Sequence, residues 1–137
     1  MSNRTNNGKN DVLNVLFTSG LYSTKSFCLF TGGSGIQSDL ATGGSTALAH
    51  ELNSTGYSRV TKIGGTPFGT ASNGSITTNE DIKFAINSGG SDWPSISHWG
   101  MIIDGDLKMW GALTTPRTVQ VGQSIKFNPG DLTVSVS

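Results

Sequence analysis

The sequence has little charge, and the charge that it has is balanced. Charged residues make up 13% of the 137 residues, against about 25% in an average soluble domain. Nine basic residues match nine acidic ones. A chain with no basic surface is not expected to bind nucleic acid, and one with no acidic tail is not expected to bind a cationic partner.

Long apolar runs are absent as well. No run approaches the roughly 20 residues of a membrane-spanning helix. Residues 1–9 are polar throughout, without the apolar core of a signal peptide. We therefore expect no membrane partner and synthesis in a cytoplasm.

Groups that bind metals or catalyse reactions are scarce. The single cysteine, Cys28, lies in an apolar run and is expected to be a small buried residue. This cysteine and the two histidines, His50 and His98, lack the spacing of a zinc site. The acidic residues Asp104 and Asp106 lack the EF-hand pattern. We predict no metal, no cofactor and no enzymatic activity.

The glycine-rich segment and His98 could belong to a phosphate-binding loop and a hydrolase site, but the sequence motifs of such sites are missing. Residues 31–45 hold two Gly-Gly pairs, yet the spacings of phosphate-binding loops are missing, so a long surface loop is predicted. His98 has serines nearby, but no nucleophile elbow frames it. A surface or interface histidine is the favoured interpretation, and a hydrolase centred on His98 is the alternative.

Small polar residues take the place of charge. Serine, threonine, asparagine and glycine fill nearly half of the chain. Such a weakly charged surface suits dense packing beside identical neighbours, where like charges would repel one another. An ordinary loop-rich β-protein has the same composition, and composition alone favours that simpler interpretation.

Residues 92–136 have the clearest structural pattern. Ser97–Ile103 and Leu107–Leu113 alternate apolar and small or polar residues around Asp104-Gly105, a strong hairpin signal. Pro116 is expected to close the second strand, because proline cannot donate to the ladder. Turns at 122–123 and 128–131 separate three more short strands, at 119–121, 125–127 and 132–136. Five strands in succession predict a β-meander or part of a Greek key.

The rest of the chain adds one helix and several strands. Asp11–Thr18 is predicted to be a short helix. Strands are expected at 26–30, 57–63, 76–79 and 81–86, whereas Thr46–Leu52 is either a helical turn or an extended edge. The sum is an all-β fold, an antiparallel β-sandwich or jelly-roll-like barrel. One domain is predicted over residues 11–137, preceded by an extended polar arm at residues 1–10.

Three tryptophans, Trp93, Trp99 and Trp110, lie in or beside the best hairpin. By alternation, Trp99 shares a face with Met101, whereas Trp110 lies with Lys108. Aromatic side chains on an exposed face can stack on sugars or anchor a protein interface. Burial of all three in the core is an equally good interpretation.

Several short motifs, in order, are similar to those of a known family. They are Glu51-Leu52 followed by Thr55-Gly56-Tyr57-Ser58-Arg59, then Ser72-Asn73, Asp81-Ile82-Lys83-Phe84, Asp92 to Gly100, Gly111 to Val119, Gly122 and Gly130-Asp131-Leu132. Over Glu51–Val136 the chain resembles short tailed-phage virion proteins that are often labelled phage tail fibre protein. Before Glu51 it departs from that pattern, because the longer glycine-rich segment replaces a compact one.

The resemblance implies a structural protein of the virion, made in the cytoplasm of a host bacterium. The first hypothesis is a capsid decoration (cement) protein, a homotrimer whose arm binds the major capsid protein or other virion proteins. The alternative is a tail-fibre or tail-tip component involved in host attachment, and the third is a carbohydrate-binding module using Trp93, Trp110 and Tyr57. The residues predicted to bind partners are Asn3, Arg4, Asn6, Asn7, Lys9, Trp93, His98 and Trp110.

Overall fold

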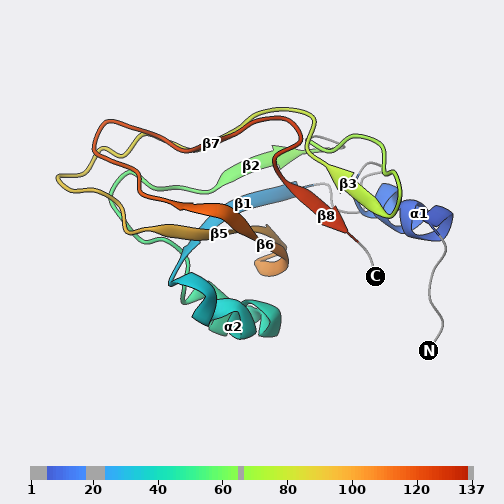
Figure 1. Ribbon diagram of the computed structural model, residues 1–137, viewed down its shortest axis with the longest axis horizontal. Coiled ribbons are helices and arrows are strands. Elements are labelled where there is room, and N and C mark those ends of the chain that lie inside the picture. Colours follow the sequence, from blue (N-terminus) through green and yellow to red (C-terminus); the bar gives the residue numbers. More distant parts are fainter. Residues whose placement is uncertain (1–5, 18–23, 65–66, 136–137) are drawn as a thin grey trace. The chain divides into compact units, whose positions relative to one another are not determined.

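The computed structural model describes residues 6–17, 24–64 and 67–135, with the backbone alone for residues 6–8 (Figure 1). Their contacts group into two compact units. The central unit comprises residues 26–61 and 83–126, and the terminal unit comprises the described residues within 1–25, 62–82 and 127–137.

The central unit is built on a four-stranded sheet with the order β2-β1-β5-β6. The strands are β1 (Thr24–Thr31), β2 (Val60–Ile63), β5 (Ile96–Ile103) and β6 (Asp106–Arg117). β5 pairs antiparallel with both β1 and β6, and every one of its residues is buried. Apolar side chains on both faces of one strand make β5 the centre of the core.

The hairpin between β5 and β6 has the predicted turn. Asp104 and Gly105 have φ angles of 54° and 81°, the two positive values that a type I′ turn requires. β6 does not end at Pro116, however, but continues to Arg117. Its register shifts between the pairs His98↔Ala112 and Ile96↔Arg117. The extra residues bulge out of the ladder, and a proline is tolerated at a bulge because no donor is needed there.

The prediction of a surface loop at residues 31–45 is wrong, because most of this segment is helical. It forms η1 (Gly33–Ile36), α2 (Gln37–Thr42) and α3 (Gly44–Leu48). The Gly43-Gly44 pair separates two helices: Gly43 has φ 74°, and its N–H donates to the carbonyls of Asp39 and Leu40. Glycine commonly ends a helix in this way.

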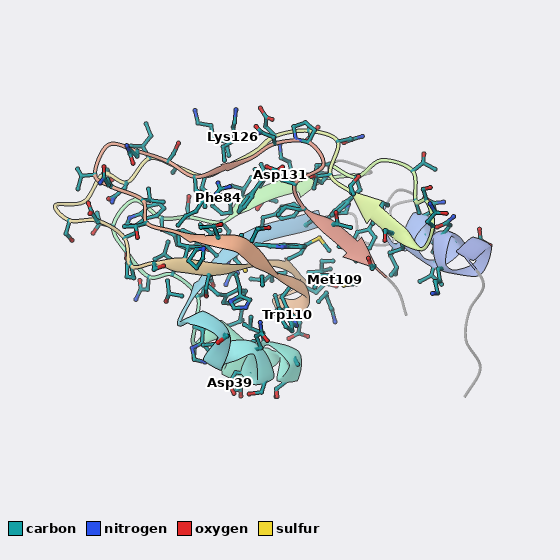
Figure 2. The ribbon with its side chains drawn as sticks, viewed as in Figure 1. Asp39, Phe84, Met109, Trp110, Lys126 and Asp131 are labelled. Carbon is teal, nitrogen blue, oxygen red and sulfur yellow. The ribbon has the colours of Figure 1, made fainter. Side chains whose placement is uncertain are left out.

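An apolar face holds the helical segment against the sheet. Ile36, Leu40 and Ala47 form one buried cluster with the sheet residues Cys28, Phe30, Ile102 and Leu107. Leu48 and Trp110 pack against this cluster. Figure 2 shows Trp110 between β6 and the helical segment, and Asp39 on the side of α2 that faces away from the sheet.

In the terminal unit, α1 (Asn6–Phe17) lies against β3 (Ser75–Thr77), which pairs antiparallel with β8 (Thr133–Ser135). The helix begins at Asn6, so residues 6–10 of the predicted arm are helical. The side-chain oxygens of Asn10 and Asn14 accept the backbone N–H groups of Gly74 (2.8 Å) and Ala71 (3.0 Å). Polar residues spaced four apart thus fix one helix face.

The prediction of an antiparallel all-β fold is confirmed. The sheets and the few short helices are consistent with a β-sandwich, and the strands do not close into a barrel. A third pair consists of β4 (Ile82–Lys83) and β7 (Lys126–Phe127). The predicted strand at 81–86 is reduced to β4, and 119–121 is irregular although Val119 is buried. Within the three described ranges, none of the helices has the length and apolar character of a membrane span.

Candidate functional site

The predicted partner-binding residues do not converge on one site. Asn3 and Arg4 lie outside the described residues, and Asn6 and Asn7 belong to α1. Lys9, also in α1, lies close beside Gly74 of its own unit. The other three, Trp93, His98 and Trp110, belong to the central unit.

Trp93 joins two loops from within. Its side chain is 2% exposed, and its indole Nε1–H donates to the carbonyl of Thr55 at 3.0 Å. Its backbone N–H donates to the carbonyl of Val119 at 2.9 Å. Tyr57 meets it edge to face, with ring centroids 6.0 Å apart. A tryptophan held in this way has no open face on which a sugar ring could stack.

The Glu51–Arg59 motif forms one hydrogen-bonded network. The Glu51 carboxylate accepts the Tyr57 hydroxyl at 2.6 Å and both Nε and Nη2 of Arg59, at 2.9 and 2.6 Å. The Tyr57 oxygen in turn accepts the backbone N–H of Leu29 at 3.1 Å, and its ring stacks on Phe84. Burial, followed by the hydrogen bond to Glu51, raises the pKa of Tyr57. This network ties the 51–59 segment to β1.

Cys28 is buried, as predicted, and completes the same region. Its side chain has no exposed surface, and burial, reinforced by the charge of Glu51, raises the pKa of its thiol. A thiol is a weak nucleophile until it ionises. Cys28 therefore acts as part of the core.

His98 is buried in a second, closed polar cluster. Its side chain is 2% exposed, with Nδ1 2.8 Å from the Ser97 hydroxyl and Nε2 3.3 Å from the Gln37 side-chain amide. The partner of Nε2 is the Gln37 amide nitrogen, which can only donate, so Nε2 is the acceptor and carries no proton. The Ser97 oxygen accepts the backbone N–H of Gly33 at 3.1 Å. The ring proton of the neutral histidine therefore lies on Nδ1 and is donated to the Ser97 oxygen at 2.8 Å.

The electrostatics agree with a neutral ring. Burial lowers the pKa of His98, and the Trp110 ring lies 5.8 Å away in a tilted arrangement. Ser97 and His98 have the residue types of a nucleophile and a base, but both are buried against η1 and α2. The cluster joins the helical segment to the sheet.

An open polar site exists elsewhere in the central unit. A hollow of about 240 Å³ lies between two loops, residues 53–55 and residues 87–93. Apart from one tryptophan, the lining residues have short polar side chains or none: Asn53, Ser54, Thr55, Asn87, Gly89, Gly90, Ser91, Asp92 and Trp93. We call it the polar hollow.

Asn87 shapes one wall of the polar hollow. It is fully buried, and its Nδ2 donates to the carbonyls of Ser91 and Val119, each at 3.0 Å. Its Oδ1 accepts the N–H of Gly89 at 3.0 Å. One side chain thus fixes the whole turn, and the signal in the sequence is an asparagine directly before Ser-Gly-Gly-Ser.

The terminal unit has an apolar hollow on α1. It measures about 280 Å³ and is lined by Asp11, Val12, Val15 and Leu16. Val15 is 52% exposed. Across the described parts of both units, no group of three or more histidine, cysteine or carboxylate side chains is placed to hold a metal ion.

Comparison with known proteins adds a family to this geometry. A family model described as podophage GP4 fiber I protein gp80 matches residues 3–135. No curated protein matches the sequence. The family match includes the segment before Glu51, where the sequence motifs had given no resemblance. Because the match spans nearly the whole sequence, the chain belongs to the Gp80 family of podophage GP4 fiber I proteins.

Proposed function

We propose that this protein is a structural component of a podophage tail fibre with a part in host attachment. The observation that carries the proposal is the family match over residues 3–135. It makes the protein a virion component and favours the tail-fibre alternative over a capsid decoration protein. Synthesis in the host cytoplasm follows from the same assignment and remains a prediction.

The structure also weakens the physical reason for the decoration hypothesis. That hypothesis relied on an extended arm at residues 1–10 that would lie on the capsid shell. Residues 6–10 belong to α1. The side-chain oxygen of Asn10 already accepts a hydrogen bond from the Gly74 N–H, so it is not available to bind a partner. A helix packed on its own unit is unsuited to that role.

Assembly with other virion proteins is part of the proposal. Val12, Val15 and Leu16 form an apolar surface on α1, and apolar surfaces of this kind are typical of protein interfaces. A homo-oligomer, with a trimer as first choice, remains our prediction. The predicted absence of catalysis fits the buried states of Ser97 and His98.

The test is the number of copies in purified virions, measured by quantitative mass spectrometry against the major capsid protein. A tail-fibre component is expected at a small fraction of the capsid protein. A copy number close to that of the capsid protein, in a fixed ratio to it, would overturn the proposal in favour of decoration. Absence from the particle would reject a structural role in the virion.

A further inference from the structure

The polar hollow has a size that suits one small ligand. Its volume of about 240 Å³ falls just below the range of about 300–1,000 Å³ typical of sites for drug-sized molecules. Ligands of one ring fit that description, whereas a peptide or an oligonucleotide does not. The walls come from two loops of the same unit.

The two loops that form these walls are held in place by contacts within the protein. Trp93 links the two loops, since its indole donates to the Thr55 carbonyl at 3.0 Å, and its own backbone N–H is held by the Val119 carbonyl at 2.9 Å. Gly89 lies so close to Thr55 that a Cβ at Gly89 would be 3.1 Å from the Thr55 Cβ. A site that is already ordered loses less conformational entropy when it binds.

The lining excludes most charged ligands. Its one ionisable residue is Asp92, and no lysine, arginine or histidine belongs to it. Phosphate, sulfate and carboxylate groups need cationic or strongly donating partners. Calcium needs six to eight oxygen ligands, commonly from several carboxylates. A neutral ligand is therefore favoured.

The remaining groups match hydroxyls. Asn53, Ser54, Thr55 and Ser91 provide amide and hydroxyl groups that both donate and accept hydrogen bonds. Each hydroxyl of a neutral ligand can donate one hydrogen bond to such a group and accept another from a neighbouring one. Because Trp93 is 2% exposed, recognition proceeds through hydrogen bonds and not through ring stacking.

We propose that the polar hollow binds a single neutral sugar residue of a cell-surface polysaccharide. This inference deepens the proposed function and rests on it for the choice of ligand, because a fibre meets polysaccharide on the host surface. A site with so few contacts binds weakly, with a Kd of about 1 mM. Many copies on a fibre raise the avidity far above that of one site.

The test uses the full chain, labelled with 15N, titrated with five separate probes: D-glucose, D-galactose, D-mannose, L-rhamnose and N-acetyl-D-glucosamine. At least one sugar is expected to give saturable amide shifts confined to residues 53–55 and 87–93. Gly90→Gln should abolish these shifts, because Gly90 has open space beyond its Cα and the new side chain would occupy the hollow. Asp92→Ala, which removes the one carboxylate of the lining, should weaken binding several-fold.

Gly35→Gln is the matched control. Gly35 and Gly90 are both exposed, have ordinary φ angles and have no atom within 4 Å of an added Cβ. The control should bind as the unaltered chain does. Shifts that persist in Gly90→Gln would overturn the proposed position of the site.

Two further results would overturn the proposal. One is the absence of saturable shifts with all five sugars at about 50 mM, well above the expected Kd. The other is a response of the same residues to Ca²⁺ or inorganic phosphate but to no sugar. Either outcome leaves the copy number in the virion unaffected, so failure of the sugar site is distinguishable from failure of the tail-fibre assignment.

Discussion

The central unit contains two groups of polar residues with opposite properties. Around His98, each polar group has a partner within the fold: Ser97 bridges Gly33 and His98, and His98 reaches Gln37. In the polar hollow, Asn87 is similarly occupied, but the loops that it holds leave hydroxyl and amide groups facing a space of about 240 Å³. A polar residue type therefore says little about function until its hydrogen-bond partners are known.

The largest effect on stability should come from Gly100→Ala, in the buried core of the central unit. A Cβ at Gly100 would lie 2.5 Å from Phe30 Cε2, 2.7 Å from Leu107 Cδ1 and 2.9 Å from Cys28 Sγ. Overpacking at three contacts should lower the free energy of unfolding by about 3 kcal/mol. Chemical denaturation measures it. Gly35→Ala, where nothing lies within 4 Å, is the control, and an equal loss in that variant would refute the packing explanation.

The next effect should come from Tyr57→Phe. Removing the hydroxyl leaves the Leu29 N–H without an acceptor and takes one donor from Glu51. Loss of a buried partner should lower the free energy of unfolding by about 1–2 kcal/mol. Arg59→Gln, at the more exposed side of the same network, should lower it by less than about 1 kcal/mol. The two variants are compared by urea denaturation, and the reverse order would contradict the assignment of Tyr57 as the inner member.

A smaller effect should appear as the pH falls. Burial lowers the pKa of His98 in the folded chain below its ordinary value of 6.5. The unfolded chain then binds its proton first, so stability is complete above about pH 6.5 and declines from there down to the folded-state pKa. The groups that face the ring, from Ser97, Gln37 and Trp110, are neutral. Thermal unfolding between pH 8 and pH 5 measures the slope.

The two histidines provide the comparison for that slope. His98→Gln should remove the part of the pH dependence that His98 contributes. His50→Gln should retain it, because His50 pairs instead with Asp39 at 2.8 Å. A slope unchanged in His98→Gln would show that another group is responsible.

The smallest effect on stability should come from Gly90→Gln in the open region. A Cβ added at Gly90 would meet no atom within 4 Å, so the free energy of unfolding should change by no more than about 0.5 kcal/mol. Loss of sugar shifts in a variant that unfolds normally would sharpen the contrast between the two polar groups. Strong destabilisation would instead show that Gly90 has a structural role.

Features determined by neighbouring residues were predictable from the sequence. The β5–β6 hairpin is one, because Asp104 and Gly105 fix a turn between two alternating strands. Burial of Cys28 is another, because its neighbours are apolar. In both cases the information lies within a few residues along the chain.

Features that depend on distant partners were not predictable. Asn10 and Asn14 looked like residues of a polar arm and of a short helix, because their partners at Gly74 and Ala71 lie 64 and 57 positions away. The glycine pair at 43–44 looked like a loop, although it separates two short helices that bury Leu40 and Ala47. The polar hollow requires the bond from Trp93 to Thr55, 38 positions apart.

The tail-fibre assignment is tested most directly by the position of the protein on the particle. Purified virions labelled with gold-conjugated antibody against the full chain can be imaged by electron microscopy. The family match over residues 3–135 leads us to expect gold at the tail and its fibres. Gold distributed over the head would contradict the assignment and restore the capsid decoration hypothesis.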